Sequence, residues 1–507
     1  MKEHLPVLQV IIPLIAAPVC MLAYRPKLAW LIATAVSWTA FIIASILLIT
    51  VRETGTLSYA LGGWAAPWGI EYRVDTISAF VLLIVAGISA VTILFARKSV
   101  EREIEPDRIY LFYTAWVLCL TGLLGIAITG DVFNLFVFLE ISSLSTYALI
   151  AFGSDRRALI AAYRYLVMGT IGATFIVIGI GFLYAMTGTL NMLDLAERLP
   201  SVSNTRTIAV AFAFMTVGIS LKVALFPLHA WLPNAYTYAP SAVSALLAGT
   251  ASKVGVYILL RFLFTVFGGG FAFDTMVLNG ILLVLALLAI LSGPLIAVFQ
   301  TNLKRMLAYS SVAQIGYTVL GVSLASITGL TASIVHLFNH ALIKTVLFMA
   351  LGAVFYRIGS VSITEINGLG RRMPWTMAAF VAGGLSLIGV PMTAGFISKW
   401  YLISASLEKG LWPVVVVIII ASLLAVVYVW RVVEAAYFQP AAEKSSTGVT
   451  DTVIKGREEA PLGMLIPIWA LVAANIYFGL DASLTTGVAR QAAETLLGGL
   501  SLTVWGG

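Results

Sequence analysis

One long apolar stretch in the last quarter of the chain decides the fold class. Residues 411–438 read LWPVVVVIIIASLLAVVYVWRVVEAAYF. At about 1.5 Å per residue, this stretch is long enough to cross the roughly 30 Å hydrocarbon layer of a membrane as an α-helix. Its run Val414–Ile420 has no polar residue, whereas the strands of a membrane β-barrel alternate between polar and apolar residues. Because buried backbone groups must bond internally in a membrane, the stretch predicts a membrane-spanning helix.

Similar apolar runs recur along the whole chain. Of its 507 residues, 60% are hydrophobic and 10% are charged, whereas about a quarter of the residues of a soluble domain are charged. This composition excludes a water-soluble fold. We therefore expect an all-α polytopic membrane protein with about fourteen transmembrane helices. The predicted spans are 7–24, 28–50, 75–95, 109–129, 131–152, 163–187, 206–236, 240–264, 275–300, 309–328, 331–356, 374–406, 411–438 and 460–481.

The first apolar run has the length of a signal peptide, but we interpret it as a retained span. Ala17-Pro18-Val19 before Cys20 is not a small-residue cleavage site, and a second apolar run follows directly. Cys20 and Cys119 both lie in predicted spans, so neither a disulfide framework nor a cysteine metal site is expected. No cofactor is expected either.

Basic residues in the loops are distributed unevenly between the two sides of the membrane. Loops on one side carry 18 of them, including Lys304, and loops on the other side carry 7. Because cytoplasmic loops are enriched in lysine and arginine, we expect the first side to be cytoplasmic and both termini to lie outside. The expected location is a bacterial or archaeal cell membrane. This bias also accounts for the net charge of +7, so no affinity for nucleic acid is inferred.

The other 5 of the 30 basic residues lie well inside predicted spans, where charge is costly. They are Lys222, Lys253, Arg261, Lys344 and Lys399. Arg261 lies near the outer end of its span, where its side chain could reach the membrane surface. The four lysines lie deep. Lysine loses its proton more readily than arginine when it is desolvated, so a row of deep lysines is suited to proton transfer.

Glu140 is the acidic residue that lies well inside a predicted span. It follows Asp131, at the outer mouth, by nine residues, so it is about 14 Å deeper and near the middle of the membrane. A charge at that depth costs several kcal/mol, and we interpret Glu140 as a functional residue that faces the protein interior. The alternative is a carboxylate that only holds helices together. The four deep lysines favour the functional interpretation.

A row of ionisable residues is expected on one face of the span 331–356. His336, His340 and Lys344 are spaced by four residues, which aligns them along a helix. Imidazole titrates near physiological pH, so this face could relay protons. A zinc site is the rival interpretation. It is disfavoured because no glutamate follows the first histidine and no third ligand is evident.

Two predicted spans contain helix breakers close to a deep lysine. Lys222 precedes Pro227 and Pro233, and Lys399 follows Pro391 by eight residues. Proline removes a backbone donor and clashes with the preceding turn, and backbone freed in this way is stable only inside protein or beside water. At full helical rise, Lys399 would lie about 12 Å beyond its break.

The breaks fall in spans seven and twelve, which are five spans apart. Corresponding broken helices in two halves indicate an internally repeated transporter, and an odd repeat length makes the repeats inverted. His229, between the two prolines of the first break, could line a water pocket or hydrogen-bond to freed carbonyls. The predicted segments are 1–108 (three spans and loops), 109–266 and 267–438 (two five-helix repeats, each a proton half-channel), and 439–507 (polar loop, last span and tail).

The chain resembles the antiporter-like subunits shared by respiratory complex I, membrane-bound hydrogenases and Mrp-type sodium/proton antiporters. The resemblance covers roughly residues 107–438, and its specific stretches keep their order and spacing. These stretches are Gly130–Glu140 (GDVFNLFVFLE), Lys222–Gly249, His336–Lys344 and Gly395–Trp400 (GFISKW).

The resemblance implies roles for the deep charges. Glu140 on the fifth span would pair with Lys222 on the broken seventh span, and Lys253 on the eighth span would pass charge along a central polar axis. The eleventh and twelfth spans would supply the second half-channel. Its residues would be His336, His340, Lys344 and Lys399.

Within this family the chain looks most similar to the D subunit of an Mrp antiporter, because its length leaves no room for the lateral helix or the added domain of larger members. The resemblance implies a proton-translocating subunit of a multisubunit monovalent cation (sodium)/proton antiporter, a secondary transporter rather than an enzyme. The alternative is a proton-pumping subunit of a complex I-like or hydrogenase-like redox complex. Both functions require partner membrane subunits and a lipid bilayer. A solitary solute transporter is disfavoured because no pocket for an organic substrate accompanies the charges.

Overall fold

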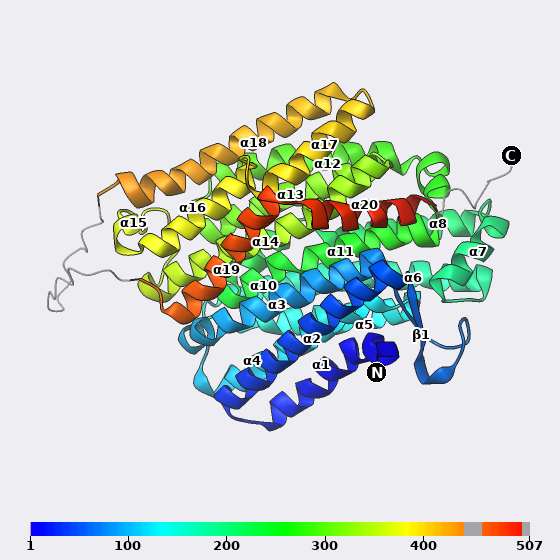
Figure 1. The fold of residues 1–507 in the computed structure, drawn as a ribbon, viewed down its shortest axis with the longest axis horizontal. Helices are drawn as coiled ribbons and strands as arrows, with labels where there is room; N and C mark the ends of the chain where they lie inside the picture. The colour runs from blue at the N-terminus through cyan, green and yellow to red at the C-terminus, as the bar shows by residue number, and fades with distance from the viewer. Residues whose placement is uncertain (1, 441–458, 499–507) are drawn as a thin grey trace.

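The computed structural model describes residues 2–440 and 459–498. It is a bundle of long helices whose axes lie roughly parallel to one another (Figure 1). In the described residues, twelve helical segments are long and apolar enough to cross a membrane. The less apolar helix α13 and the broken pair α16 and α17 complete the fourteen predicted spans. The prediction of an all-α polytopic membrane fold is therefore confirmed.

The spans follow one another along the chain, most of them as single helices. In chain order they are α1 (Leu5–Leu22), α2 (Pro26–Thr54), α3 (Thr76–Glu103), α4 (Ile109–Ile128), α5 (Val132–Ala151), α6 (Arg157–Thr187), α8 (Arg206–Val223) with α9 (Leu232–Tyr238), α10 (Ser241–Gly249) with α11 (Ala251–Leu260), α12 (Leu278–Val298), α13 (Leu303–Ser323), α14 (Ile327–Ile358), α16 (Pro374–Ile388) with α17 (Ala394–Glu408), α18 (Trp412–Val433) and α19 (Leu462–Leu480). Single turns η4 (Arg261–Val266) and η6 (Glu434–Phe438) extend α11 and α18.

A β-hairpin and the helices α7 and α20, all outside the spans, were not predicted. The strands β1 (Leu57–Ala60) and β2 (Glu71–Val74) form an antiparallel hairpin between α2 and α3, with Leu57 opposite Val74. Helix α7 (Met192–Val202) lies at the same end of the bundle, and α20 (Ser483–Gly498) follows α19. We call this end the hairpin end, and we call the opposite end, where α15 (Leu369–Arg372) lies, the α15 end (Figure 1). The predicted loop at 441–458 lies outside the described residues.

Polar side chains begin several spans by capping the free N–H groups of the first turn. Asp75 accepts a hydrogen bond from the Ser78 N–H at the start of α3 (3.0 Å), and Asp131 accepts one from the Asn134 N–H at the start of α5 (2.7 Å). Gly359, with a φ of 74°, ends α14 in the left-handed conformation that favours glycine. These local signals lie at the membrane surfaces, so the spans between them remain apolar.

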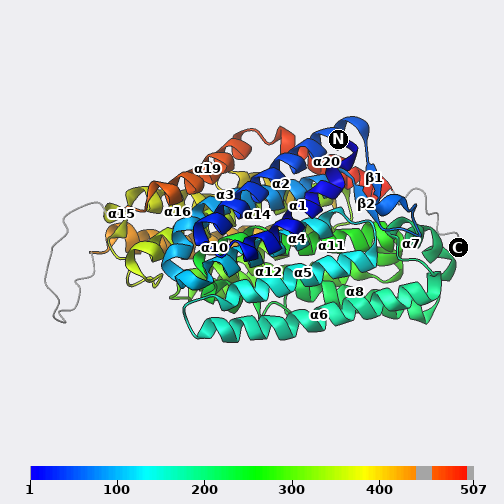
Figure 2. The same ribbon diagram turned by 90° about the horizontal axis from the view of Figure 1, so that it is seen from below.

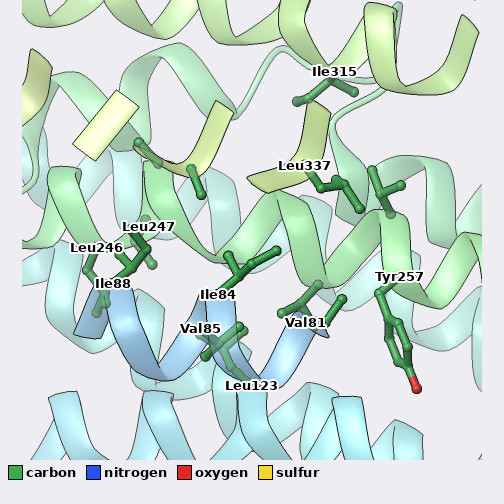
Figure 3. Packing of buried hydrophobic residues seen from close by; sticks show 14 of the residues in the cluster. Val81, Ile84, Val85, Ile88, Leu123, Leu246, Leu247, Tyr257, Ile315 and Leu337 are labelled. Carbon is green, nitrogen blue, oxygen red and sulfur yellow. The ribbon is translucent and has the colours of Figure 1, made fainter. Parts of the chain in front are cut away.

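Helix α14 is the centre of the bundle. It packs against α3, α10, α13, α16, α17, α19 and α20, and its residues from Gly329 to Val354 are buried. Figure 3 shows part of the apolar packing around it, with Ile84 and Ile88 of α3 close to Leu246 and Leu247 of α10. Helices α6 and α19 lie at opposite margins of the bundle (Figure 2). The peripheral helices α6, α12 and α18 expose apolar residues, as a lipid-facing surface requires.

The two predicted helix breaks are present. Helix α8 ends at Val223, Ala224 adopts a left-handed φ of 62°, and the chain is not helical again until α9. Pro227 lies in this break, whereas Pro233 is in the first turn of α9, where proline is tolerated. Pro233 was predicted to break the helix and instead helps to begin one. In the second break, Gly389 has a φ of 91°, and Pro391 lies between α16 and α17.

A third interruption, at Thr250 between α10 and α11, was not predicted. Gly249 precedes it, and a Cβ atom at this glycine would lie 2.4 Å from the Thr345 hydroxyl of α14. The glycine therefore allows α10 to approach α14 closely. No proline marks this site, which is why the sequence indicated one continuous span.

Candidate functional site

The first group of charged residues joins α5 and α8. Lys222, in the last turn of α8, is buried, and its Nζ lies 3.5 Å from Glu140 Oε1 and donates a hydrogen bond of 2.8 Å to Ser143 Oγ. The Glu140 side chain is 26% exposed on the flank of the bundle. It was expected to face the protein interior, and this partial exposure corrects that expectation. The structure therefore brings the predicted pair together at an open edge rather than in a sealed core.

A small cavity of about 30 Å³ lies beside this pair. Ser142, Ser143, Thr146 and the Lys222 side chain line it, together with residues of α11 such as Ala251. This volume corresponds to about one water molecule, and the lining offers several polar partners. The cavity therefore provides a polar step from Lys222 toward α11, the helix that carries Lys253.

Lys253 is fully buried near the first turn of α11. Its Nζ donates hydrogen bonds to the Ala248 carbonyl, at the end of α10, and to Ser252 Oγ (3.4 Å). The Ala248 carbonyl lies in the last turn before the interruption at Thr250, where the regular helical bonding ends. The unpredicted interruption thus supplies the group that holds the lysine.

The predicted ionisable face of α14 is formed by buried residues. The rings of His336 and His340 lie 5.9 Å apart in a nearly parallel arrangement, and His336 Nδ1 shares a hydrogen bond of 2.8 Å with Ser398 Oγ of α17. Lys344 Nζ donates to the Leu307 carbonyl (2.8 Å) and to Ser310 Oγ of α13. The Nε2 atoms of both histidines are buried without a protein partner in the described chain. Each is therefore a ring nitrogen that remains available to donate or accept a hydrogen bond, depending on the tautomer.

Lys399, on α17, lies against the second helix break. Its Nζ donates to the carbonyls of Leu387 (3.1 Å) and Ile388 (2.7 Å), at the end of α16, and to Ser422 Oγ of α18 (3.0 Å). The expectation that it lies about 12 Å beyond the break is wrong for its ammonium group. A lysine side chain on a helix points back toward the N terminus of that helix, so the charge returns to the break.

Several polar residues near these charges were not singled out from the sequence. Ser398 and Tyr317 connect the α14 histidines with Lys399 of α17. The Tyr317 ring lies 5.7 Å from the His336 ring and 5.2 Å from Lys399 Nζ, and Ser398 Oγ is hydrogen-bonded to His336. Ser310 and Ser422 each bind a lysine. Hydroxyl residues inside otherwise apolar spans are a usable signal, but their number in this chain hides the few that face the lysines.

Arg261 does not extend away from the protein, as its position allowed, but pairs with Asp75 at the start of α3. It is buried and donates to both carboxylate oxygens of Asp75, with a distance of 2.7 Å for one of them, and to Tyr257 Oη (2.9 Å). Burial by itself would raise the pKa of Asp75, but the charge of Arg261 and the hydrogen bonds from Arg261 and Ser78 hold it below its ordinary value. This pair joins α3 to the end of α11.

Lys304 was counted as a loop charge, yet it is buried at the start of α13. Its Nζ donates to the Ala239 carbonyl at 3.2 Å. A polar cavity of about 190 Å³ at the α15 end is lined by Lys304, Glu103 and Asp155. Because α13 begins six residues earlier than the predicted span, Lys304 becomes the inner wall of this cavity.

His229 lies in the first break, half-buried, with its ring stacked on Phe226 at 5.3 Å. Its Nδ1 has no hydrogen-bond partner in the described residues. At this break the Leu221 carbonyl accepts from Trp231 Nε1 (3.0 Å) as well as from the Ala224 N–H (3.2 Å). The side chain bonded to this carbonyl is therefore Trp231 and not His229.

Together these groups form a discontinuous row of ionisable and hydroxyl side chains between the two helix breaks. The row contains carboxylate, ammonium, imidazole and hydroxyl groups, each of which can donate or accept hydrogen bonds. In the described residues, no group of three or more histidine, cysteine or acidic side chains is arranged to hold a metal ion.

Comparison with known proteins places this arrangement in a family. The family model described as NADH:quinone oxidoreductase/Mrp antiporter, transmembrane, matches residues 129–425, more than half of the chain. The chain belongs to this family. It is an antiporter-like membrane subunit, as the sequence motifs indicated.

Relatives within the family come from two kinds of assembly. The N-type subunit of the NADH-quinone oxidoreductase of Desulforudis audaxviator (strain MP104C) is 41% identical over 95% of this chain and 96% of its own length. The D-type subunit of the Na(+)/H(+) antiporter of Bacillus subtilis (strain 168) is 30% identical, with 97% of both chains covered. The family prediction is confirmed, while the greater identity is with the oxidoreductase protein rather than with the antiporter protein.

Solved structures of the family share the whole fold. A chain of the Mrp complex from Dietzia sp. DQ12-45-1b has a TM-score of 0.87 at 26% identity, covering 98% of this chain and 97% of that chain. A chain of the membrane-bound sulfane sulfur reductase, an archaeal respiratory membrane complex, has a TM-score of 0.85 at 32% identity, covering 97% and 98%. The matched chains of both assemblies thus have the architecture of this chain over nearly its full length.

Proposed function

We propose that this chain is the proton-translocating membrane subunit of a redox-driven respiratory complex. The observation that carries proton translocation is the row of buried lysines and histidines between the two broken helices. Glu140 and Lys222 form its first part, Lys253 its middle, and His336 and Lys399 its second part. Charges of this kind inside a membrane are costly and mark pathways for ions or protons.

The relatives favour a redox-driven assembly over an antiporter. The identity to the NADH-quinone oxidoreductase relative is 41%, against 30% to the Na(+)/H(+) antiporter relative, and both alignments cover more than nine-tenths of the chain. A redox-driven function requires partner subunits that carry the electron-transfer centres. The chain itself would supply the proton path.

The second candidate is a proton-translocating subunit of a monovalent cation/proton antiporter. It is favoured by the similarity to the Na(+)/H(+) antiporter relative and by the high TM-score with the Mrp complex chain. The proton path would be the same in this case, but the energy would come from an existing ion gradient.

We further propose that the α15 end faces the cytoplasm of a bacterial or archaeal cell and that the hairpin end faces outward. The excess of basic loop residues at the α15 end supports this orientation. The polar cavity beside Lys304 would then open a hydrated entry from the cytoplasm.

A partner membrane subunit is proposed to cover the flank at Glu140. A carboxylate that is 26% exposed at this depth would face hydrocarbon if the subunit were alone in the bilayer. A neighbouring protein surface with polar groups removes that cost. This contact would also give the partner access to the first proton-exchanging pair.

The experiment that tests the proposal is purification of the intact complex from native membranes, followed by identification of its subunits and reconstitution into sealed vesicles. Iron–sulfur or nickel subunits, together with proton movement that stops when electron transfer is inhibited, are expected. Small hydrophobic antiporter subunits and proton movement driven by a sodium gradient would instead establish the second candidate. Proton movement by neither reaction would refute both.

A further inference from the structure

The backbone at the second helix break is held by two asparagines from helices outside the break. Ala394 is the first residue of α17, and its N–H donates to Asn475 Oδ1 of α19 at 3.3 Å. Its carbonyl accepts from Asn339 Nδ2 of α14 at 2.6 Å. Both asparagine side chains are buried. The two polar groups of one backbone residue are therefore bonded by two different helices.

Helix α19 packs so closely against the backbone of this break that no side chain fits at Gly479. A Cβ atom at Gly479 would lie 2.4 Å from the Thr393 carbonyl carbon and 2.5 Å from the Met392 carbonyl oxygen. Gly479 follows Asn475 by four residues, so both face the break from one side of α19. The Phe478 ring also packs edge-to-face on Phe338 of α14 at 4.8 Å. The last span therefore contacts the backbone of the break directly and also packs against α14.

The position of Ala394 determines that of Lys399. Both belong to α17, five residues apart, and the Lys399 ammonium bonds back to the carbonyls of Leu387 and Ile388 at the end of α16. These bonds form only if the start of α17 stays close to the end of α16. A shift of Ala394 by a fraction of the hydrogen-bond length would separate the ammonium from one or both carbonyls.

The first break is held differently. There Trp231 donates to the Leu221 carbonyl, and its ring stacks on Tyr165 of α6 at 3.9 Å. Both contacts come from helices that precede α12. The second break instead depends on α19, which lies outside both predicted repeats.

We infer that Asn475 and Asn339 are positioning residues for Lys399: they fix the start of α17 so that the Lys399 ammonium remains on the freed carbonyls of α16. This inference rests on the proposed role of Lys399 in proton transfer. The last span thereby takes part in the function of the second half of the path.

The inference predicts opposite effects of one substitution at the two positions. Asn475 uses its acceptor oxygen, which aspartate retains, so Asn475→Asp should keep a near-normal rate of proton translocation. Asn339 uses its donor, which an ionised aspartate lacks, so at a pH where the carboxyl is ionised Asn339→Asp should reduce the rate at least about fivefold, the factor expected for one lost hydrogen bond. Asn475→Leu and Asn339→Leu should both be reduced by a similar factor. Any other order of the two aspartate variants overturns the assignment.

Two further measurements separate positioning from a general loss of structure. The pH profile of translocation should move in the two leucine variants, because the surroundings of the Lys399 ammonium change, while the yield of assembled complex should stay within about twofold of the wild type. Hydrogen–deuterium exchange of the peptide covering 389–399 in the purified complex should be faster in both leucine variants and unchanged in Glu140→Gln. Unchanged exchange in this peptide overturns the inference. That readout does not need activity, so a wild-type complex without proton movement would count against the proposed function alone.

Discussion

Replacing Glu140 by glutamine removes one charge of the first pair at nearly constant volume. The Lys222 Nζ lies 3.5 Å from Glu140 Oε1, and Coulomb's law gives an attraction of about 4.7 kcal/mol at an effective dielectric constant of about 20. Because the carboxylate is partly exposed, we also use a dielectric constant of about 40, which halves the attraction to about 2.4 kcal/mol. Each 1.4 kcal/mol or so is a factor of ten in a rate or an equilibrium constant. If transfer depends on this attraction, translocation should fall by at least about fiftyfold.

The assay is proton uptake into sealed vesicles that contain the assembled complex, normalised to the amount of this subunit. Glu197→Gln is the matched control, because it is the same substitution at an exposed residue of α7, outside the spans. The control should keep the wild-type rate. Assembled Glu140→Gln complexes that translocate protons at the wild-type rate would refute the reasoning, since the pair would then only hold α5 against α8.

Three further predictions concern the other buried charges. Lys222→Arg should reduce translocation at least about tenfold, because arginine retains its proton; full turnover in the vesicle assay would mean that the residue serves as a fixed charge. Lys399→Ala should stop translocation without loss of assembly, whereas Lys399→Glu should keep part of it because a carboxylate also titrates; an active alanine variant excludes Lys399 as a carrier. Asp75→Asn should lower the stability of the purified complex by about 3 kcal/mol or more, because the Arg261 charge stays buried without its partner. Since the pKa of Asp75 lies below its ordinary value, the stabilisation is complete at neutral pH and is lost only as the pH falls through that lowered pKa; an unchanged midpoint of thermal unfolding at neutral pH contradicts this prediction.

Sequence patterns predicted the features that arise from local chemistry. The spans follow from apolar length, and the two main breaks follow from Gly389, Pro227 and Pro391, residues whose backbone limits act within one turn. The contact of Glu140 with Lys222 was implied by the resemblance to the antiporter-like subunits, and the structure places the two side chains side by side. The spans and the breaks needed only the positions of residues along the chain, whereas the pairing needed the family.

The features that were missed depend on contacts between distant segments. The interruption at Thr250 reflects a close approach of α10 to α14, and the burial of Lys304 reflects where α13 begins. Arg261 stays inside because Asp75, 186 residues away in sequence, is positioned to pair with it. Asn475 was missed because its hydrogen-bond partner, the backbone N–H of Ala394, is 81 residues away and cannot be identified from the sequence.

The deep lysines differ in the groups that bind their ammonium ions. This difference affects how readily each lysine would lose its proton in the proposed path. Among the described residues, Lys222 has a carboxylate within 4 Å, whereas Lys253 and Lys399 each rest on carbonyls at the end of a preceding half-helix. The C-terminal end of a helix carries only about half a negative charge, so it holds an ammonium less strongly than a carboxylate does. A positive charge that arrives nearby can therefore displace the proton from Lys253 or Lys399 more easily than from Lys222. The protonation state of Glu140 would then control when charge leaves the first pair, and the half-helix ends would let it pass along the remainder of the row.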